Sequence, residues 1–167
     1  VCTEDRDLIG DIDTIPYPAW DLLPQEIYMH NQTGQLPTPT AYITTTRGCP
    51  YQCTYCYHPF QNQKIRMHSA RRIVEEIRHL KTHYGIDSCI FADDLFVVNK
   101  ERVYEVCDLL RKERMNLQWM AAARVNLVDE QLLRAMKSAG CVALGFGIES
   151  GSQAILDNIK KKVTVSQ

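Results

Sequence analysis

The stretch "AYITTTRGCPYQCTYCYH" (residues 41–58) joins the two features that decide the fold, a short apolar run and a loop of crowded cysteines. The cysteines are Cys49, Cys53 and Cys56, and the next one along the chain is Cys89. The run before them, residues 41–46, is too short for a helix and is typical of a strand buried on both faces. A loop that directly follows such a strand is where α/β proteins place their chemistry.

Three more short apolar runs follow, at residues 88–92, 117–123 and 141–147, and helical patterns come after each of the four. The residues expected to cap or end these helices are Ser69 and Gly85, Asn99, Asp129 and Gly140, and Ser152. Strand–helix alternation repeated four times predicts an α/β fold with a parallel sheet. Four βα units make only part of a closed eight-unit barrel, so we expect a partial (βα) barrel.

Residues 1–40 differ from the rest of the chain. They hold five of the seven prolines and show no sustained apolar period. Because proline fixes φ and lacks an N–H, we expect an extended linker or wrapping arm, with Trp20, Leu22 and Leu23 packed onto the domain that follows. The predicted division is an arm of residues 1–40 and a partial core domain of residues 41–167, truncated on its C-terminal side.

The composition excludes several classes of protein. A net charge of −1 argues against a general nucleic-acid or membrane surface. No apolar run approaches the ~20 residues that cross a bilayer. The seven cysteines are odd in number and three of them are crowded, unlike the disulfide framework of a small secreted domain. This pattern favours thiolates that bind metal in a reducing compartment, and we expect the cytoplasm.

Polar residues follow each predicted strand at its carboxyl end. After the cysteine loop come Asp93 and Asp94, then Arg124, then Glu149 and Ser150. Because the carboxyl ends of parallel strands meet at one edge of the sheet, these side chains are expected to gather there.

Ordinary roles for the same residues remain open. The aspartates could cap the following turn, the arginine could form a rim salt bridge of small value, and the serine could cap the next helix. The run Lys160–Lys162 is interpreted as a solvated helix end.

The cysteine spacing suits an iron–sulfur cluster better than zinc. Structural zinc needs four ligands, and here only Cys53 and Cys56 form a C-x2-C pair; His58 would have to strain the loop to complete the site. A four-iron cluster normally takes one thiolate for each iron. Three thiolates therefore leave one iron open to a substrate or cofactor. The zinc alternative predicts that His58→Ala abolishes metal binding.

The segment "CPYQCTYC" has C-x3-C-x2-C spacing with the aromatic Tyr55 before its last cysteine, and it resembles the cluster-binding loop of the radical S-adenosylmethionine (radical SAM) superfamily. The resemblance implies that Cys49, Cys53 and Cys56 hold a [4Fe-4S] cluster. It implies that S-adenosylmethionine chelates the fourth iron and is cleaved reductively to a 5′-deoxyadenosyl radical. The family core generally has six βα units, so with four we expect this chain alone to be inactive.

Further motifs extend the resemblance over residues 41–167. "FADDLF" resembles the segment that meets the methionine amino group, and "AAARVN" places its arginine where members present a side chain to the cofactor. In "GIESGS" the glutamate would accept from ribose hydroxyls and the serine would add a polar contact, while the tyrosine of the cysteine loop would lie beside adenine. The residues implied in cofactor binding are Tyr55, Asp93, Asp94, Arg124, Glu149 and Ser150.

Within the superfamily, "DIDTIPYPAWDLLP" (11–24) with "DDLF" and "GIESGS" is most similar to members that carry an upstream cobalamin-binding domain. Many of these are methyltransferases or catalyse biosynthetic rearrangements. The chain has no D-x-H-x-x-G loop, so cobalamin would be used only with the rest of the full-length protein. A methylthiotransferase or a non-catalytic zinc or iron–sulfur domain is the alternative. Expected partners are a small-molecule or biosynthetic substrate and an electron donor such as flavodoxin or ferredoxin, without nucleic acid or membrane.

Overall fold

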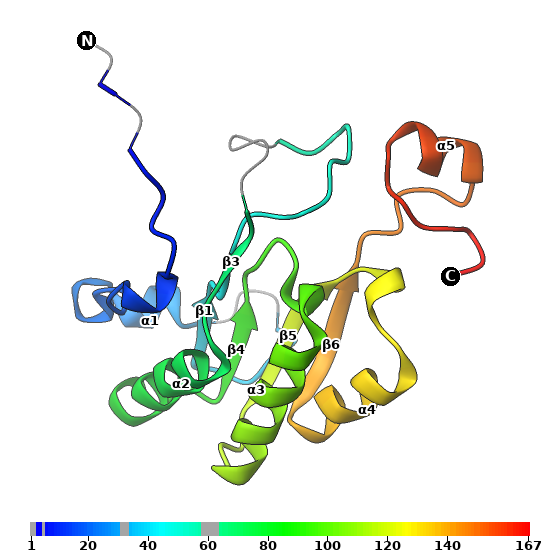
Figure 1. The fold of residues 1–167 in the computed structure, drawn as a ribbon. Coiled ribbons are helices and arrows are strands. Elements are labelled where there is room, and N and C mark those ends of the chain that lie inside the picture. The colour runs from blue at the N-terminus through cyan, green and yellow to red at the C-terminus, as the bar shows by residue number, and fades with distance from the viewer. Residues whose placement is uncertain (1–2, 5, 31–33, 58–63) are drawn as a thin grey trace.

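A four-stranded parallel sheet forms the centre of the computed structural model, which describes residues 3–4, 6–30, 34–57 and 64–167. Across the sheet the strands lie in the order β1 (Thr40–Ile43), β4 (Ser88–Phe91), β5 (Gln118–Ala123) and β6 (Cys141–Phe146). All three neighbouring pairs are parallel. The predicted α/β fold is therefore confirmed as a partial barrel of four βα units (Figure 1).

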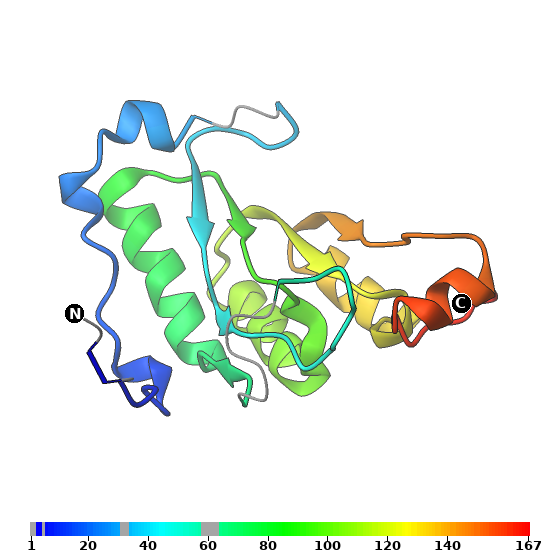
Figure 2. The ribbon, with the colours of Figure 1, turned by 90° about the horizontal axis from the view of Figure 1, so that it is seen from above.

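Helices α2 (Ala70–Tyr84), α3 (Lys100–Lys112) and α4 (Glu130–Ser138) cover one face of the sheet, and α5 (Gln153–Asn158) follows β6 (Figures 1 and 2). The predicted caps are present, because the side chains of Ser69, Asn99 and Asp129 each accept a backbone N–H at a helix start. Gly85 ends α2 in the left-handed conformation, with φ 62°. Ser152 begins α5 without a side-chain cap.

The hydrophobic core lies between the sheet and these helices. Phe91, Phe96 and Trp119 are buried there, and the rings of Phe91 and Phe96 stack with centroids 4.3 Å apart. The opposite face of the sheet is open in the described part of the chain, where Tyr42 is 47% exposed and Met120 is half-buried. The prediction of strands buried on both faces is wrong here, because four strands do not close a barrel around that face.

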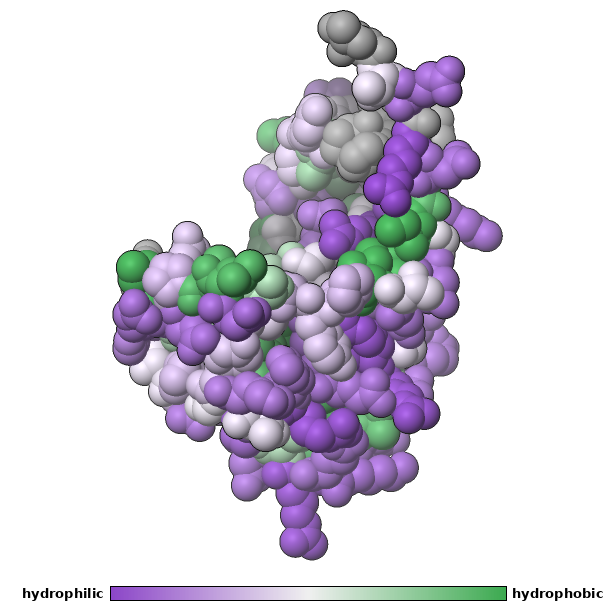
Figure 3. Space-filling view, turned by 90° about the vertical axis from the view of Figure 1, so that its left-hand side faces the viewer, coloured by the Kyte–Doolittle hydropathy of each residue, from purple (hydrophilic) through white to green (hydrophobic). Residues whose placement is uncertain are grey.

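The arm runs beside α2 and contains the short turns η1 (Ile12–Thr14), η2 (Trp20–Leu22) and α1 (Gln25–Tyr28) (Figure 2). Trp20 is buried as predicted, but Leu22 is 79% exposed and Leu23 is exposed too. That part of the prediction is wrong because a single turn of 3₁₀-helix points successive side chains in different directions. The face that carries the arm is mainly hydrophilic, with apolar side chains in separate places (Figure 3).

Two short strands close the cysteine loop at its base. β2 (Thr46–Arg47) and β3 (Arg66–Met67) pair in antiparallel fashion, with Thr46 opposite Met67 and Arg47 opposite Arg66. Sequence reasoning missed them because two-residue strands carry no periodic pattern. Across the described ranges, no helix combines the length and apolar character needed to cross a membrane.

Candidate cofactor site

The cysteine loop leaves the carboxyl end of β1 and carries three free thiols, on Cys49, Cys53 and Cys56. Burial raises the pKa of the Cys56 thiol, and the nearby Cys53 and Cys49 raise it further. The three sulfurs share one loop, although no three His, Cys, Asp or Glu side chains already converge as metal ligands in the described residues. His58, the zinc alternative's fourth ligand, lies outside those residues.

Arg124 lies at the centre of the site and is buried. Its guanidinium stacks over Tyr51, 3.6 Å from the ring centroid, and donates to Cys53 Sγ at 3.7 Å. It also donates to Asn126 Oδ1 at 3.3 Å and to the backbone carbonyl of Lys161. No carboxylate pairs with Arg124 among the described residues, so the rim salt bridge is not formed. The side chain instead joins the cysteine loop, the end of β5 and the segment after α5.

Glu149, Lys161 and Tyr55 form a polar cluster beside this arginine. The Lys161 ammonium donates to Tyr55 Oη at 2.9 Å and to Glu149 Oε1 at 3.0 Å. The hydrogen bond from Lys161 lowers the pKa of Glu149. Burial lowers the pKa of Lys161, but the bonds to Tyr55 and Glu149 outweigh burial and leave it raised. Both shifts favour the ionised pair.

Lys161 is only 6% exposed, so the interpretation of Lys160–Lys162 as a solvated helix end is wrong for its middle residue. The chain turns sharply here, because Lys160 and Lys162 both adopt positive φ, 53° and 54°. This geometry sends the middle side chain inward while its two neighbours remain exposed.

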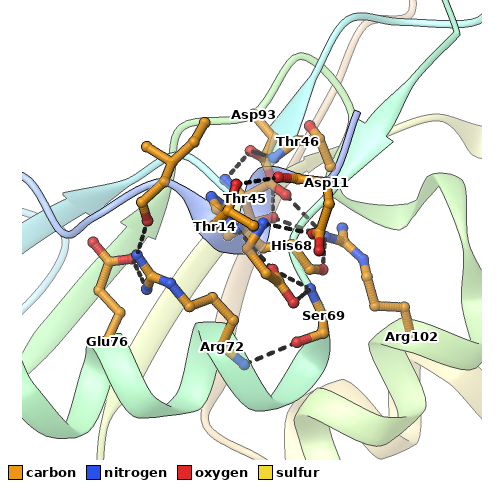
Figure 4. A network of polar contacts seen from close by, with 12 residues as sticks. Asp11, Thr14, Thr45, Thr46, His68, Ser69, Arg72, Glu76, Asp93 and Arg102 are labelled. Atoms are coloured by element: carbon orange, nitrogen blue, oxygen red, sulfur yellow. Dashed lines mark hydrogen bonds and ion pairs between the residues drawn. The ribbon is translucent and has the colours of Figure 1, made fainter. Parts of the chain in front are cut away.

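Asp93 is buried and bonded to the turn after β1 (Figure 4). Its carboxylate accepts from the Thr45 N–H at 2.5 Å, the Thr45 hydroxyl at 2.5 Å and the Thr46 N–H at 2.7 Å. Arg102 donates to the Thr45 carbonyl at 3.2 Å and to the Phe96 carbonyl at 3.0 Å. Burial lowers the pKa of Arg102, opposed by the charge of Asp93. This network fixes the point where β1 passes into the cysteine loop.

The remaining two predicted residues have different surroundings. Asp94 is exposed and has no hydrogen-bond or ion-pair partner within the described chain. The Ser150 hydroxyl accepts from the Ser152 N–H at 3.0 Å, just before α5. That bond is a local turn contact at the residue before α5, so the Ser150 side chain does not cap the first turn of the helix.

The structure therefore gathers Tyr55, Arg124 and Glu149 around the cysteine loop, whereas Asp93 faces the turn after β1. Sequence reasoning missed Lys161 and Arg102. A buried cation in a lysine run or on an amphipathic helix has the same sequence context as an exposed cation, so no sequence pattern indicated that these two side chains are buried.

The fold and these contacts define an α/β domain that gathers three free thiols and several polar side chains at the carboxyl edge of its parallel sheet. The model of the radical SAM superfamily matches residues 43–167. This chain belongs to that superfamily. Membership identifies it as part of an enzyme and implies a [4Fe-4S] cluster and S-adenosylmethionine as its cofactors.

Two relatives are methyltransferases by name. The chain is 38% identical over 163 residues to an uncharacterized methyltransferase of Pyrococcus horikoshii, covering 97% of this chain and 34% of that protein. It is 32% identical over 162 residues to the cytidylyl-2-hydroxyethylphosphonate methyltransferase of Streptomyces wedmorensis, covering 93% of this chain and 30% of that one. The chain thus spans about a third of the length of these relatives.

A solved structure shares the fold. The radical S-adenosylmethionine methyltransferase TsrM of Kitasatospora setae, with cobalamin and a [4Fe-4S] cluster bound, superposes with a TM-score of 0.66 at 19% identity. The match covers 75% of this chain and 24% of that one.

The side chains at the site fit an iron–sulfur cluster. Three thiols on one loop are free of disulfides, and they supply the soft ligands that iron–sulfur clusters take. The buried Arg124 places a cation beside Cys53, where a thiolate-bound cluster would add negative charge.

Proposed function

We propose that Cys49, Cys53 and Cys56 hold a [4Fe-4S] cluster and that S-adenosylmethionine takes its remaining iron. The observation that supports this most is the position of three free thiols on the loop after β1, beside the buried Arg124. When bound, the cluster supplies the electron that cleaves the cofactor, and the protein supplies binding, orientation and exclusion of water.

The polar residues of the site would divide the work of holding the cofactor. Glu149 would accept from the ribose hydroxyls, and Tyr55 would lie beside the adenine. Asp94, exposed and without a partner in the described chain, would accept from the methionine amino group. Asp93 would act through the Thr45–Thr46 turn rather than by direct contact.

Arg124 and Ser150 would have mixed roles. The arginine would orient the loop through Cys53 and, with its planar fork, present a cation to the cofactor carboxylate. The serine would add a polar contact next to its bond with the start of α5.

For the whole protein we propose transfer of a methyl group, or a biosynthetic rearrangement, on a small-molecule substrate. Support comes from two relatives named as methyltransferases and from the fold shared with cobalamin-bound TsrM. Cobalamin would be held by a region outside this chain. A flavodoxin or ferredoxin in the cytoplasm would donate the electron.

The cluster assignment can be tested by anaerobic reconstitution of the full-length protein with iron and sulfide. We expect about four irons per chain in the wild type and a large loss of iron in Cys53→Ser. Cys2→Ser is the matched control, because that cysteine lies far from the loop in sequence, and it should keep its iron. An unchanged iron content in Cys53→Ser would contradict the cluster assignment. Zinc that is bound by the wild type and lost in His58→Ala would show instead that the loop forms a structural zinc site.

A further inference from the structure

The three residues after α5, Ile159–Lys161, lie against the cysteine loop although about a hundred residues separate them in sequence. Their three successive carbonyls are all engaged. The Thr54 N–H donates to the Ile159 carbonyl at 3.0 Å, and Cys53 Sγ lies 3.8 Å from the Lys160 carbonyl. The third carbonyl, of Lys161, accepts from Arg124. We call residues 159–161 the brace.

The backbone of the brace is shaped for these contacts. Lys160 within the brace and Lys162 directly after it are both left-handed, a conformation that non-glycine residues seldom adopt. Such residues persist where the surrounding structure holds them, and here the turn lets the Lys160 and Lys161 carbonyls reach the loop and Arg124 while the Lys161 side chain points inward.

The Lys161 ammonium connects two residues to which the proposed function gives a role in cofactor binding. It lies 2.9 Å from Tyr55 Oη, 3.0 Å from Glu149 Oε1 and 5.7 Å from the centroid of the Tyr55 ring. With 7% of its side chain exposed, this cation has little water to compensate it, so its two partners must do so. Glu149 itself has a left-handed backbone, with φ 63°, so the orientation of its side chain also depends on the contacts that surround it.

We propose that Lys161 is a positioning residue for the binding of S-adenosylmethionine. Its ammonium holds the Glu149 carboxylate and the Tyr55 ring in place, and the brace to which it belongs steadies the cysteine loop. Lys161 makes no contact with the cofactor in this role. The role in cofactor binding rests on the proposed function, whereas the role in steadying the loop rests on the contacts of the brace alone.

The test compares Lys161→Met with Lys162→Met in the full-length protein. Both replace a lysine in the same turn, but the Lys162 side chain is exposed. We expect Lys161→Met to keep most of its iron after reconstitution and to bind S-adenosylmethionine roughly tenfold or more weakly, by titration of the cluster's EPR signal. Lys162→Met should match the wild type, and Lys161→Arg should recover part of the affinity.

A double-mutant cycle distinguishes positioning from a general loss of structure. If Lys161 acts through Glu149, Lys161→Met and Glu149→Gln together should weaken cofactor binding by less than the product of their single effects. Effects that multiply, or a Lys161→Met variant that binds the cofactor like the wild type, would overturn the proposal.

Hydrogen exchange of the apo-protein tests the loop without any cofactor. The Thr54 amide should exchange faster in Lys161→Met than in Lys162→Met, because the brace loses its bond to the neighbouring Tyr55. Equal exchange in the two variants would overturn the role of Lys161 in steadying the loop. If the wild-type protein binds neither cluster nor cofactor, the proposed function is refuted. The exchange rate of the Thr54 amide would still show whether Lys161 steadies the cysteine loop.

Discussion

Asp93 and Asp94 are adjacent in sequence, yet their carboxylates have opposite surroundings. Three donors from Thr45 and Thr46 surround the buried Asp93, whereas Asp94 is exposed and has no partner in the described residues. A buried carboxylate that accepts several hydrogen bonds is costly to alter, because its donors are left without acceptors. We therefore expect Asp93 to affect stability and Asp94 to affect cofactor binding, although both follow β4.

Asp93→Asn should lower the free energy of unfolding by about 2 kcal/mol, because the amide cannot accept from all three donors and leaves the buried Arg102 cation without its countercharge. Asp94→Asn should leave stability unchanged and weaken binding of S-adenosylmethionine. Urea unfolding of the two variants checks the first statement, and cofactor titration checks the second. Equal unfolding midpoints would contradict the assignment of Asp93.

Gly147 makes room for the Glu149–Lys161 pair. A Cβ atom at this position would lie 2.6 Å from Glu149 Oε1 and 3.0 Å from Lys161 Nζ, so the two charged groups would have to move. Gly147→Ala should weaken cofactor binding several-fold while the fold persists, since only side-chain ends are displaced. Gly151→Ala is the control, because its Cβ would meet nothing within 4 Å. Wild-type cofactor affinity in Gly147→Ala would show that the pair's position is unimportant.

Among the elements, the arm is attached to α2 by polar contacts at two points. The Asp13 carboxylate accepts from the Ser69 N–H at 3.0 Å and lies 3.0 Å from His68 Nδ1 (Figure 4 shows the neighbouring network). Further along, the Arg72 guanidinium stacks 3.8 Å over the Tyr17 ring and pairs with a helix glutamate. These contacts give the Pro-rich arm a fixed course beside the helix.

The Asp13 contact predicts a dependence of stability on acid. Burial raises the pKa of Asp13, but hydrogen bonds with Ser69 and His68 together lower it by more, so it lies below the ordinary value of 3.8. A depressed folded-state pKa means that the contact stabilises the fold fully above the unfolded value and is lost as pH falls through the folded one.

The difference in unfolding free energy between wild type and Asp13→Asn should therefore shrink as the pH falls below the ordinary aspartate pKa. Denaturant unfolding at a series of pH values measures it. Asp7→Asn, at an exposed position in the same arm, is the matched control and should show no such dependence. A difference that does not shrink below the ordinary aspartate pKa would refute the role of Asp13.

Elements with a clear period or cap were predictable from sequence. The four parallel strands follow from the apolar runs, and the starts of α2, α3 and α4 follow from Ser69, Asn99 and Asp129. The pair β2–β3 and the turns of the arm were not predictable, because elements of two to four residues are decided by tertiary contacts rather than by local pattern.

For the molecule as a whole, sequence predicted which strand ends carry polar residues, and the shared carboxyl edge of the sheet brought Tyr55, Arg124 and Glu149 to the cysteine loop. It did not predict Lys161, because the contact joins segments about a hundred residues apart through two left-handed residues. That this chain alone does not turn over substrate remains a prediction.

The EPR spectrum of the reduced, reconstituted full-length protein, recorded with and without S-adenosylmethionine, tests most directly whether the cluster has an open iron. We expect about four irons per chain and a spectrum that changes when the cofactor is added, because the cofactor would take the iron that the three cysteines leave open. A cluster whose spectrum ignores the cofactor would contradict the open-iron site and leave an electron-transfer or structural role. Zinc without any cluster would contradict the interpretation of the cysteine loop itself.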